Sequence, residues 1–533
     1  MVTAAVHHSP AGTPLKAIAT NPYVGILGVF LGAATATLNG RLVSVGLPDL
    51  RGSLGFGFDG ASWIPTVLNM ATMFIGVFAV FLGSVYGIRR VLLVAGTIFT
   101  VTTLLVPLFS GLGPMLLLQA IAGVSSGTFY TLTLTFVIRS LPKKLVLFGV
   151  AAYAMDIVVT SNVAALIEGW YIDHLSWHWI FWTAAVLTPV MMLCVYFGIP
   201  KTDSGPRLSW RGFLYASAGF ALIYGALDQG QRLNWWNSGT FVGMLAGGVF
   251  LLLAAFVRRY FQPNPLVNLP FLNARNVIIL GLGIVAIRFA LLAPAAAIPG
   301  FLGGVARYRP IETGAALAWV AIPQFALVWI AALLTVFIPP RIVMAAGFAT
   351  IAIACWMSAR LDSQWAGSSF TLPELILATG IAVAFVALVV NLLMLAAEMG
   401  AATNAVNAST YAAWMHTNRL LGGEVGGVVF GRFVTVREQL HSNVLGYHVT
   451  AGNWITVDRL RGMALSLTPP SAGPQEAAAR SAAILSGQIR LQAFSLAYSD
   501  AFLLIGWALA AYLLLIVCMR PNTLSLRPKE KTS

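Results

Sequence analysis

The sequence has 533 residues, of which 58% are hydrophobic and only 9% are charged, and its mean hydropathy is +0.84. A soluble domain has about 25% charged residues, so this chain has too few to cover a water-facing surface. The composition excludes a soluble enzyme, a disordered chain and a nucleic-acid-binding protein. It is typical of a polytopic protein of the lipid bilayer, in which the net charge of +14 reflects Lys and Arg kept on the cytoplasmic side.

Fourteen apolar runs follow one another along the chain. A helix needs about 20 residues to cross the hydrocarbon core, and short loops separate most of the runs. The runs lie roughly at 23–47, 61–83, 91–110, 113–138, 145–168, 177–199, 212–228, 239–257, 276–302, 312–338, 342–359, 372–397, 408–432 and 496–519. We therefore predict an all-α integral membrane protein with fourteen transmembrane helices.

The positions of Lys and Arg between the runs predict the orientation in the membrane. With the N-terminus in the cytoplasm, seventeen of these residues lie on the cytoplasmic side and five in the short outer loops. We predict that both termini are cytoplasmic. A longer outer segment of about sixty residues, 433–495, separates the last two runs, and its second part reads as a helix that starts near Pro474.

Several stretches carry a family resemblance when taken in chain order. They are Trp177–Trp182 before the sixth helix, Ala226–Trp236 between the seventh and eighth, Asn264–Arg275 before the ninth, and Arg419–Gly426 in the thirteenth. Together they resemble the fourteen-helix drug:proton antiporters of the major facilitator superfamily, the EmrB/QacA type. The long outer segment before the last helix is similar to that of the Emr branch.

The resemblance implies a major facilitator fold with two six-helix bundles, 23–200 and 276–519, the second including the periplasmic loop 433–495. Two linker helices lie between them in 201–275, and cytoplasmic tails comprise 1–22 and 520–533. It also implies export of small hydrophobic or amphipathic molecules across a bacterial inner membrane by proton antiport and alternating access. The proton gradient supplies the energy, with no cofactor. The Emr branch further implies a periplasmic adaptor and an outer-membrane channel as partners.

The chain departs from the family pattern at its usual charged positions. Asn39 stands where the first helix usually has Asp, Gln119 where the fourth has Arg, and Ser84 where the first cytoplasmic loop has an acid. Ala164-Ala165 replaces the Gly-Pro motif of the fifth helix, with Glu168 following. The usual proton-handling residues are therefore absent, and the coupling mechanism cannot be taken from the family.

Ionisable residues inside the runs are the candidates for proton coupling. A charge at mid-bilayer costs on the order of 3 kcal/mol, so each one requires a reason. The candidates are Asp156, Glu424 and Glu398. Asp156 shares a helical face with Tyr153 and Thr160. Glu424 lies in a run of glycines that permits close helix packing, whereas Glu398 is near a helix end, where it could simply be solvated.

Other polar residues inside the runs are candidates for lining a substrate cavity: Asn39, Arg41, Gln119, Tyr153, Arg288 and Arg419. Structural roles compete with this interpretation. Arg41 could extend to the membrane interface, and Gln119 with Gly123 and Gly127 could form a packing face. For Glu168, near a helix end, and for His416 we expect a solvated and a structural role, respectively.

Two other classes of function were weighed against a transporter. One is a polytopic enzyme acting on lipid-linked substrates, for which the outer segment offers His441, His448, Asp458 and Glu438 without metal-like spacing. The other is a non-transporting receptor or scaffold. Ion-driven flux in vesicles would separate the transporter from both. For 433–495 itself we weigh a docking surface for an adaptor against a cap packed over the cavity.

Overall fold

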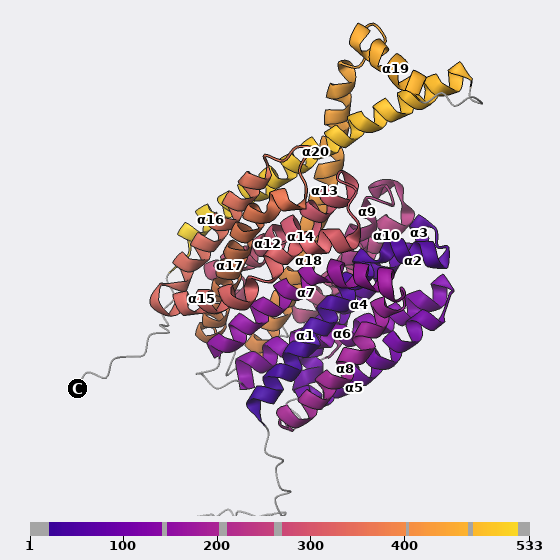
Figure 1. The fold of residues 1–533 in the computed structure, drawn as a ribbon. Coiled ribbons are helices and arrows are strands. Elements are labelled where there is room, and N and C mark those ends of the chain that lie inside the picture. Colours follow the sequence, from indigo (N-terminus) through magenta and orange to yellow (C-terminus); the bar gives the residue numbers. More distant parts are fainter. Residues whose placement is uncertain are drawn as a thin grey trace, which may run out of the picture.

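The computed structural model describes residues 21–140, 146–201, 210–260, 269–400, 405–466 and 473–520, and within these residues the regular secondary structure is entirely helical. Long helices lie side by side in one body, from which a helical hairpin projects (Figure 1). We call this the hairpin end. The start of α1 and the end of α20 lie at the opposite end of the body, the tail end. The predicted tails fall almost wholly outside the described residues.

The first half of the chain forms six long helices. They are α1 (Pro22–Val45), α4 (Trp63–Tyr86), α5 (Ile88–Leu105), α6 (Leu112–Ser140), α7 (Val146–His174) and α8 (Trp179–Gly198). The short elements α2 (Leu47–Leu54), α3 (Phe58–Ala61) and η1 (Val106–Leu108) lie in the connections. Helix α1 packs against α6, α7 and α8, while α4 packs against α6 and α5 against α8. These contacts make one bundle.

The second half forms a corresponding bundle. Its elements are α12 (Arg275–Ala290), η4 (Ala293–Ala297), α13 (Ile298–Gly304), α14 (Pro310–Ala321), α15 (Gln324–Phe337), α16 (Pro340–Ser358), η5 (Gly367–Phe370), α17 (Thr371–Glu398), α18 (Ala405–Tyr447), α19 (Trp454–Ser466) and α20 (Pro474–Val517). Two predicted helices are interrupted, at the π-helical turn η4 and between α14 and α15. Pro294 and Pro323 lie at these breaks, and proline lacks the N–H that a continuous helix needs.

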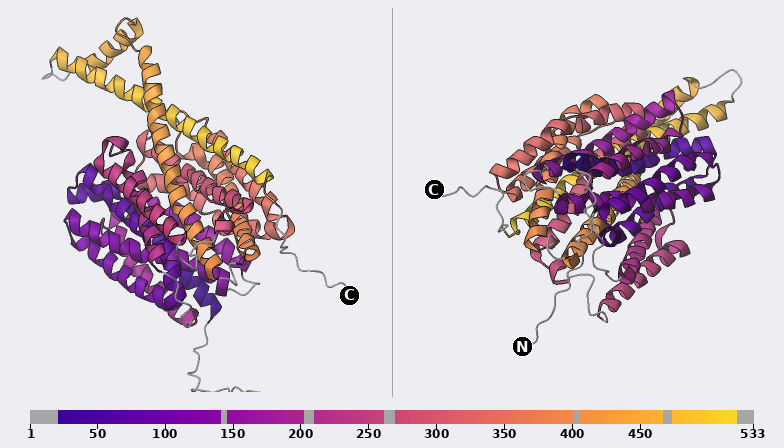
Figure 2. Two further views of the ribbon diagram at one scale, coloured as in Figure 1. Left: turned by 180° about the vertical axis from the view of Figure 1, so that it is seen from behind. Right: turned by 90° about the horizontal axis from the view of Figure 1, so that it is seen from below.

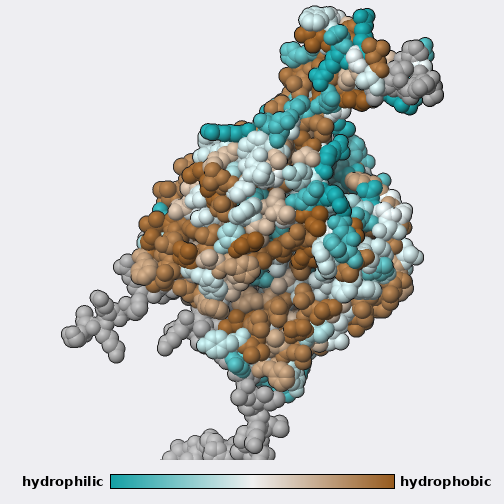
Figure 3. All heavy atoms as spheres, viewed as in Figure 1, coloured by the Kyte–Doolittle hydropathy of each residue, from teal (hydrophilic) through white to brown (hydrophobic). Residues whose placement is uncertain are grey.

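The predicted apolar runs all coincide with described helices. Among the residues that the structure describes, eleven segments are long and apolar enough to cross a membrane. The other three runs form α4, α9 (Trp210–Gly230) and α18, which are 24, 21 and 43 residues long. On the face shown in Figure 3, apolar residues cover much of the body, and hydrophilic residues gather toward the hairpin end. The all-α membrane fold predicted from the sequence is confirmed.

The two bundles meet along two lines. Helix α7 packs against α14 and α15, and α4 packs against α18. Figure 2 shows the halves side by side in both views. Near the hairpin end, Arg309 at the start of α14 pairs with Asp173 of α7. Gly169 of α7 lies against Ile311, where an added side chain would collide with backbone. The bundles are therefore in close contact at the hairpin end of α7.

The two linker helices have different surroundings. Helix α10 (Gly239–Tyr260) packs mainly against α9. Only 11% of the residues in its most apolar stretch are buried in the protein, so the bilayer must cover the others. The short elements η3 (Trp235–Asn237) and α11 (Leu269–Leu272) flank it. Helix α9 packs against both α4 and α18 as well as α10. It is therefore in contact with both bundles and is more than a connection.

Glycines set the closest helix contacts. Gly123 and Gly127 of α6 face α4, so the predicted packing face of this helix is confirmed. In α18, side chains at Gly422 and Gly426 would lie 2.6 Å from Val285 and 3.1 Å from Phe289 of α12. Gly427 has nothing within 4 Å, so it is not part of that seam.

The predicted outer loop 433–495 is mostly helix. The prediction that a helix starts near Pro474 is confirmed, since α20 begins there, but α18 also continues past 432 to Tyr447. The two extensions are held together by Asp500 of α20, whose Oδ2 lies 2.5 Å from Arg437 Nε and 2.7 Å from His441 Nε2. Helix α19 packs against α20. The hairpin projects away from the body (Figures 1 and 2), which disfavours the cap.

The α4–α6 contact predicts the effect of enlarging Gly123. In Gly123→Ala the methyl group would collide with the backbone oxygen of Leu68, so the two helices must separate. We expect a loss of about 1–3 kcal/mol, seen as a lower thermal midpoint of the purified protein. Gly427→Ala is the matched control, because its methyl group meets nothing and alanine favours a helix. Equal midpoints for the two variants would contradict the described packing.

Candidate functional site

Polar side chains from seven helices gather where α9 and the two bundles meet. We call this group the central cluster. Its members are Arg41 of α1, Thr66 of α4, Tyr130 of α6, Tyr153 of α7, Tyr224 and Asp228 of α9, Arg288 of α12, and Arg419 and Glu424 of α18. The helix packing described above brings them together from positions far apart in the sequence. The chain therefore has a polar interior between its halves.

One part of the central cluster joins the bundles through aromatic rings. The hydroxyl of Tyr153 donates a hydrogen bond to the hydroxyl of Tyr130, and both rings belong to the first bundle. The guanidinium carbon of Arg419, from the second bundle, lies 3.2 Å from the centre of the Tyr130 ring. A cation over a ring face is attracted by the ring quadrupole, most strongly when water is excluded. This contact links α6 to α18.

Three arginines form the positive part of the central cluster. Arg41 donates a hydrogen bond of 3.2 Å to the backbone oxygen of Ala295, in the π-helical turn η4. Arg288 lies against Gly423, whose missing side chain leaves room for the guanidinium group. Arg288 interacts electrostatically with both Arg41 and Arg419. Because all three carry the same charge, they repel one another unless an anion lies among them.

The acids of the central cluster, Glu424 and Asp228, lie near each other, and we call them the acid pair. Glu424 interacts with Tyr224 and Asp228 of α9 and with Arg288 of α12. Asp228 also accepts a hydrogen bond from the hydroxyl of Thr66, and Gln229 donates to it over 3.2 Å. Neighbouring carboxylates repel each other unless a proton or a cation compensates them. The acid pair lies between α9 and α18, with Arg288 beside it.

Asp156 lies at a different place from the acid pair. It lines an apolar groove of about 440 Å³ between α1, α7 and α15, together with Phe30, Phe148 and Trp329. Its Oδ2 is buried and has no hydrogen-bond partner in the part of the chain that the structure describes. Thr160 lines the same groove, but Tyr153 turns toward Tyr130 instead. The predicted shared face is therefore divided between the groove and the central cluster.

Three predicted site residues, Asn39, Gln119 and Glu398, are not members of the central cluster. Asn39 and Gln119 are buried, and one side-chain oxygen of each has no partner among the described residues. Glu398 is exposed at the end of α17, the solvated position that the sequence also allowed. Arg41 does not extend to the interface, since it reaches Ala295.

Two further expectations concern structural residues. His416 is buried, and its Nδ1 lies 3.4 Å from the hydroxyl of Thr131, which is a structural contact between α18 and α6. The expectation that Glu168 is solvated is wrong. This side chain is fully buried and lies beside Gly46, because the chain bends there from α1 into α2 and covers the end of α7.

The sequence analysis did not select Tyr224 and Asp228 of the site, or the buried Glu374. Asp228 falls within Ala226–Trp236, which resembles an outer loop, whereas α9 continues to Gly230. Tyr224 lies within the predicted run 212–228 and was not singled out there. The spacing of four residues between Tyr224 and Asp228 puts them on one helical face, which was the available signal. Glu374 of α17 is fully buried, and neither carboxyl oxygen has a partner among the described residues. Its position at the start of an apolar run gave no signal of burial.

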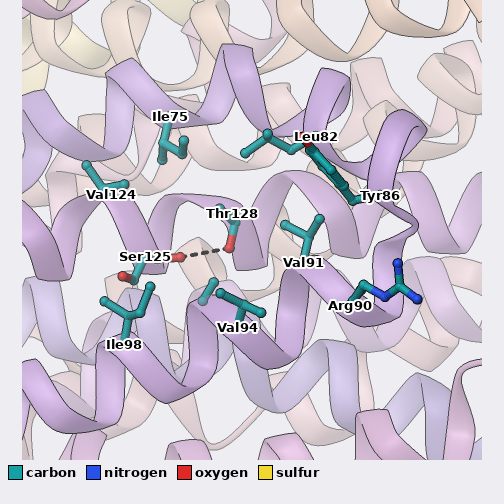
Figure 4. A pocket seen from close by; sticks show the side chains of 11 residues that line it. Ile75, Leu82, Tyr86, Arg90, Val91, Val94, Ile98, Val124, Ser125 and Thr128 are labelled. Atoms are coloured by element: carbon teal, nitrogen blue, oxygen red, sulfur yellow. Dashed lines mark hydrogen bonds between the residues drawn. The ribbon is translucent and has the colours of Figure 1, made fainter. Parts of the chain in front are cut away.

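A second groove lies away from these residues. It measures about 300 Å³ and is formed by α4, α5 and α6 (Figure 4). Its lining is apolar except for Ser125 and Thr128, which are joined by a hydrogen bond, and Tyr86 and Arg90 at its tail end. None of the central-cluster residues lines it. We assign it no part in the candidate site.

The acid pair predicts how substitutions of Glu424 affect stability. Glu424→Gln keeps the shape and can still hydrogen-bond to Tyr224 and Asp228, so we expect its thermal midpoint to stay close to that of the parent protein. Glu424→Ala leaves both partners unsatisfied and should cost about 1–3 kcal/mol. Thermal unfolding in detergent at neutral pH measures both. If Glu424→Ala were as stable as Glu424→Gln, the carboxyl group would not be part of a buried network.

Comparison with known proteins shows the family to which this architecture belongs. A family model for the major facilitator superfamily matches residues 29–417. An uncharacterised transporter of this type from Mycobacterium tuberculosis is 26% identical over 69% of this chain, which spans 63% of that protein, less than two thirds. The multidrug export protein EmrB of Haemophilus influenzae is 23% identical over 93% of this chain and 95% of its own length.

A solved structure of a bacterial homologue of the human drug peptide transporters has the same fold. Its TM-score is 0.53 at 15% identity, and the alignment covers 94% of this chain and 98% of that one. The predicted resemblance to the Emr branch is confirmed by the similarity to EmrB. A transporter family excludes the membrane enzyme considered above. The chain belongs to the major facilitator superfamily of membrane transporters.

Proposed function

We propose that this protein is a proton-coupled exporter of amphipathic small molecules that works by alternating access between its two bundles. The observation that carries the proposal is the acid pair of Asp228 and Glu424, which lies where α4, α9 and α18 meet. Neighbouring acids influence each other's ionisation, so such a pair can lose or gain a proton when the surroundings change. Its place between the bundles couples that change to their relative motion.

The proposed cycle uses the neighbours of the pair. Arg288 interacts electrostatically with Glu424, so it stabilises the ionised form of that acid. Thr66 donates a hydrogen bond to Asp228, and Tyr224 lies beside Glu424. Movement of α18 relative to α9 would change the separation of the two carboxyl groups, so that a proton is taken up or released. The relatives named as multidrug export proteins support export as the direction.

The orientation and the membrane belong to the same proposal. We place the tail end in the cytoplasm and the hairpin end outside, in the inner membrane of a bacterium, as the Lys and Arg distribution predicts. Protons would then enter from the hairpin side as substrate leaves. The acid pair lies where the linker helix α9 contacts α18 of the second bundle.

Proton coupling can be tested without knowing the substrate. We expect liposomes that contain the protein and pyranine to report proton movement when a panel of anionic, neutral and cationic amphiphiles is added outside. Glu424→Gln and Asp228→Asn each remove a carboxyl group that can take up a proton, so substrate-driven proton movement should fall at least about tenfold. Asp156→Asn should also abolish it, because Asp156 has an unpartnered carboxyl oxygen inside the membrane.

The control is Glu476→Gln, which alters an exposed pair with Arg480 on the hairpin. It should leave proton movement unchanged. Normal proton movement in Glu424→Gln and Asp228→Asn would remove the pair from the mechanism, and normal movement in Asp156→Asn would remove that residue. An absence of proton movement in the parent protein with every amphiphile would favour the receptor or scaffold interpretation.

The hairpin supports a second part of the proposal, a docking site for a periplasmic adaptor of an outer-membrane channel. Its tip exposes large apolar side chains, with Tyr447 79%, Trp454 75% and Leu465 80% exposed. Apolar side chains outside the bilayer typically mark a protein contact. The ion pairs of Asp500 with Arg437 and His441 would hold this surface at a fixed distance from the body.

Removing the tip separates docking from transport. We expect that replacing 448–472 with a short Gly/Ser linker leaves proton movement in liposomes intact, because α18 and α20 still reach each other through Asp500. Co-purification of the adaptor, and export across both membranes in cells, should be lost. The control is the double change Val436→Ser and Ile484→Ser on the shaft of the hairpin. Loss of transport in liposomes would make the hairpin part of the transport machinery and end the docking proposal.

A further inference from the structure

The three arginines of the central cluster lack a sufficient counter-charge. The buried Nε atoms of Arg41, Arg288 and Arg419 have no hydrogen-bond partner within the described ranges. All three side chains are half-buried, so part of each remains accessible. They come from α1, α12 and α18 and interact electrostatically through Arg288. Positive charges held this close in a poorly solvated interior require an anion.

The acids nearby form no ion pair with these arginines. No salt bridge joins Arg41, Arg288 or Arg419 to an acid within the described ranges. Glu424 interacts electrostatically with Arg288, whereas Asp156 lines the groove between α1, α7 and α15. Helix α4, which packs against α18, contains no Asp, Glu, Lys, Arg or His. The three guanidinium groups therefore have no paired carboxylate among the described residues.

We propose that Arg41, Arg288 and Arg419 bind the anionic group of the transported substrate, which is an amphipathic organic anion with a carboxylate, sulfonate or phosphate on an apolar body. The inference rests on the proposed function and names its substrate class. Guanidinium groups bind such oxyanions through paired N–H donors. The ring centroids of Tyr130 and Tyr153 are 5.4 Å apart, and those of Tyr153 and Phe385 are 6.2 Å apart. These three rings provide an aromatic wall for the apolar body.

The test is equilibrium binding in a non-ionic detergent, with no ion gradient. The probes are 1-pyrenesulfonate, 1-pyrenemethanol and 1-pyrenemethylammonium, which share one apolar body, and energy transfer from tryptophan to pyrene reports binding after subtraction of protein-free micelles. We expect the sulfonate to bind at least tenfold more tightly than the ammonium.

Substitutions assign the site. Arg288→Gln should weaken sulfonate binding tenfold or more, Arg288→Lys less, and pyrenemethanol binding should change less than threefold in both. Arg360→Gln, at an exposed arginine of the hairpin end, is the control. Arg41→Gln and Arg419→Gln repeat the test if Arg288→Gln does not fold.

The outcomes are distinguishable from those of the coupling experiment. Tighter binding of the ammonium, lost in Asp156→Asn, would move the substrate to the groove and overturn the proposal, as would equal binding of both charged probes. Sulfonate binding without proton movement would contradict the proposed function alone. Displacement of the sulfonate by phosphatidylglycerol in mixed micelles would support the anion site with a lipid headgroup as occupant, and lack of displacement would support a free solute.

Discussion

The structure depends on the free-energy cost of keeping charges between helices that are surrounded by hydrocarbon. A charged side chain at this depth persists only where other groups of the protein or a ligand compensate it. The helix packing follows from this requirement. Arg419 lies over the ring of Tyr130, Arg41 reaches the carbonyl of Ala295, and Arg288 occupies the space left by Gly423. Each of these contacts fixes the position of one helix relative to another.

The linker helix α9 gains its importance from the same requirement. A helix that merely joined two bundles would have no need of Asp228 or Tyr224. Here both side chains face Glu424, and Thr66 of α4 completes the contact. By contrast, α10 presents most of its surface to lipid and packs mainly against α9. The insertion of two helices therefore adds one functional surface and one lipid-facing cover. Helix α9 is thus the linker helix that contacts both bundles.

Hydropathy and proline positions predicted most of the fold, because both act locally. Every apolar run became a helix, and the start of α20 at Pro474 followed from the preference of proline for the first turn. The site was predicted less completely. Arg288, Arg419 and Glu424 were selected because a charge inside an apolar run is conspicuous. Asp228 was missed because it lies at the end of a run, where loop and helix have similar sequences.

Burial was the property that local patterns could not predict. Glu168 and Glu374 both lie near the ends of apolar runs, where water is the usual neighbour, yet both are fully buried. Glu168 is covered because the chain turns at Gly46 into α2, and no feature within α7 reports that turn. The same limitation explains the division of Tyr153 and Asp156. A helical face is a local property, whereas the partner that each side chain meets is set by neighbouring helices.

The hairpin also has a mechanical consequence. Helix α18 has 43 residues, so it is about 65 Å long, and roughly 35 Å of it extends beyond a hydrocarbon core of about 30 Å. Because α18 carries both Glu424 and the base of the hairpin, a rotation of α18 about the acid pair also moves the tip of the hairpin. A rotation of roughly 15°, typical of domain movements, would move the tip by about 9 Å. A small displacement inside the membrane would thus be amplified outside it.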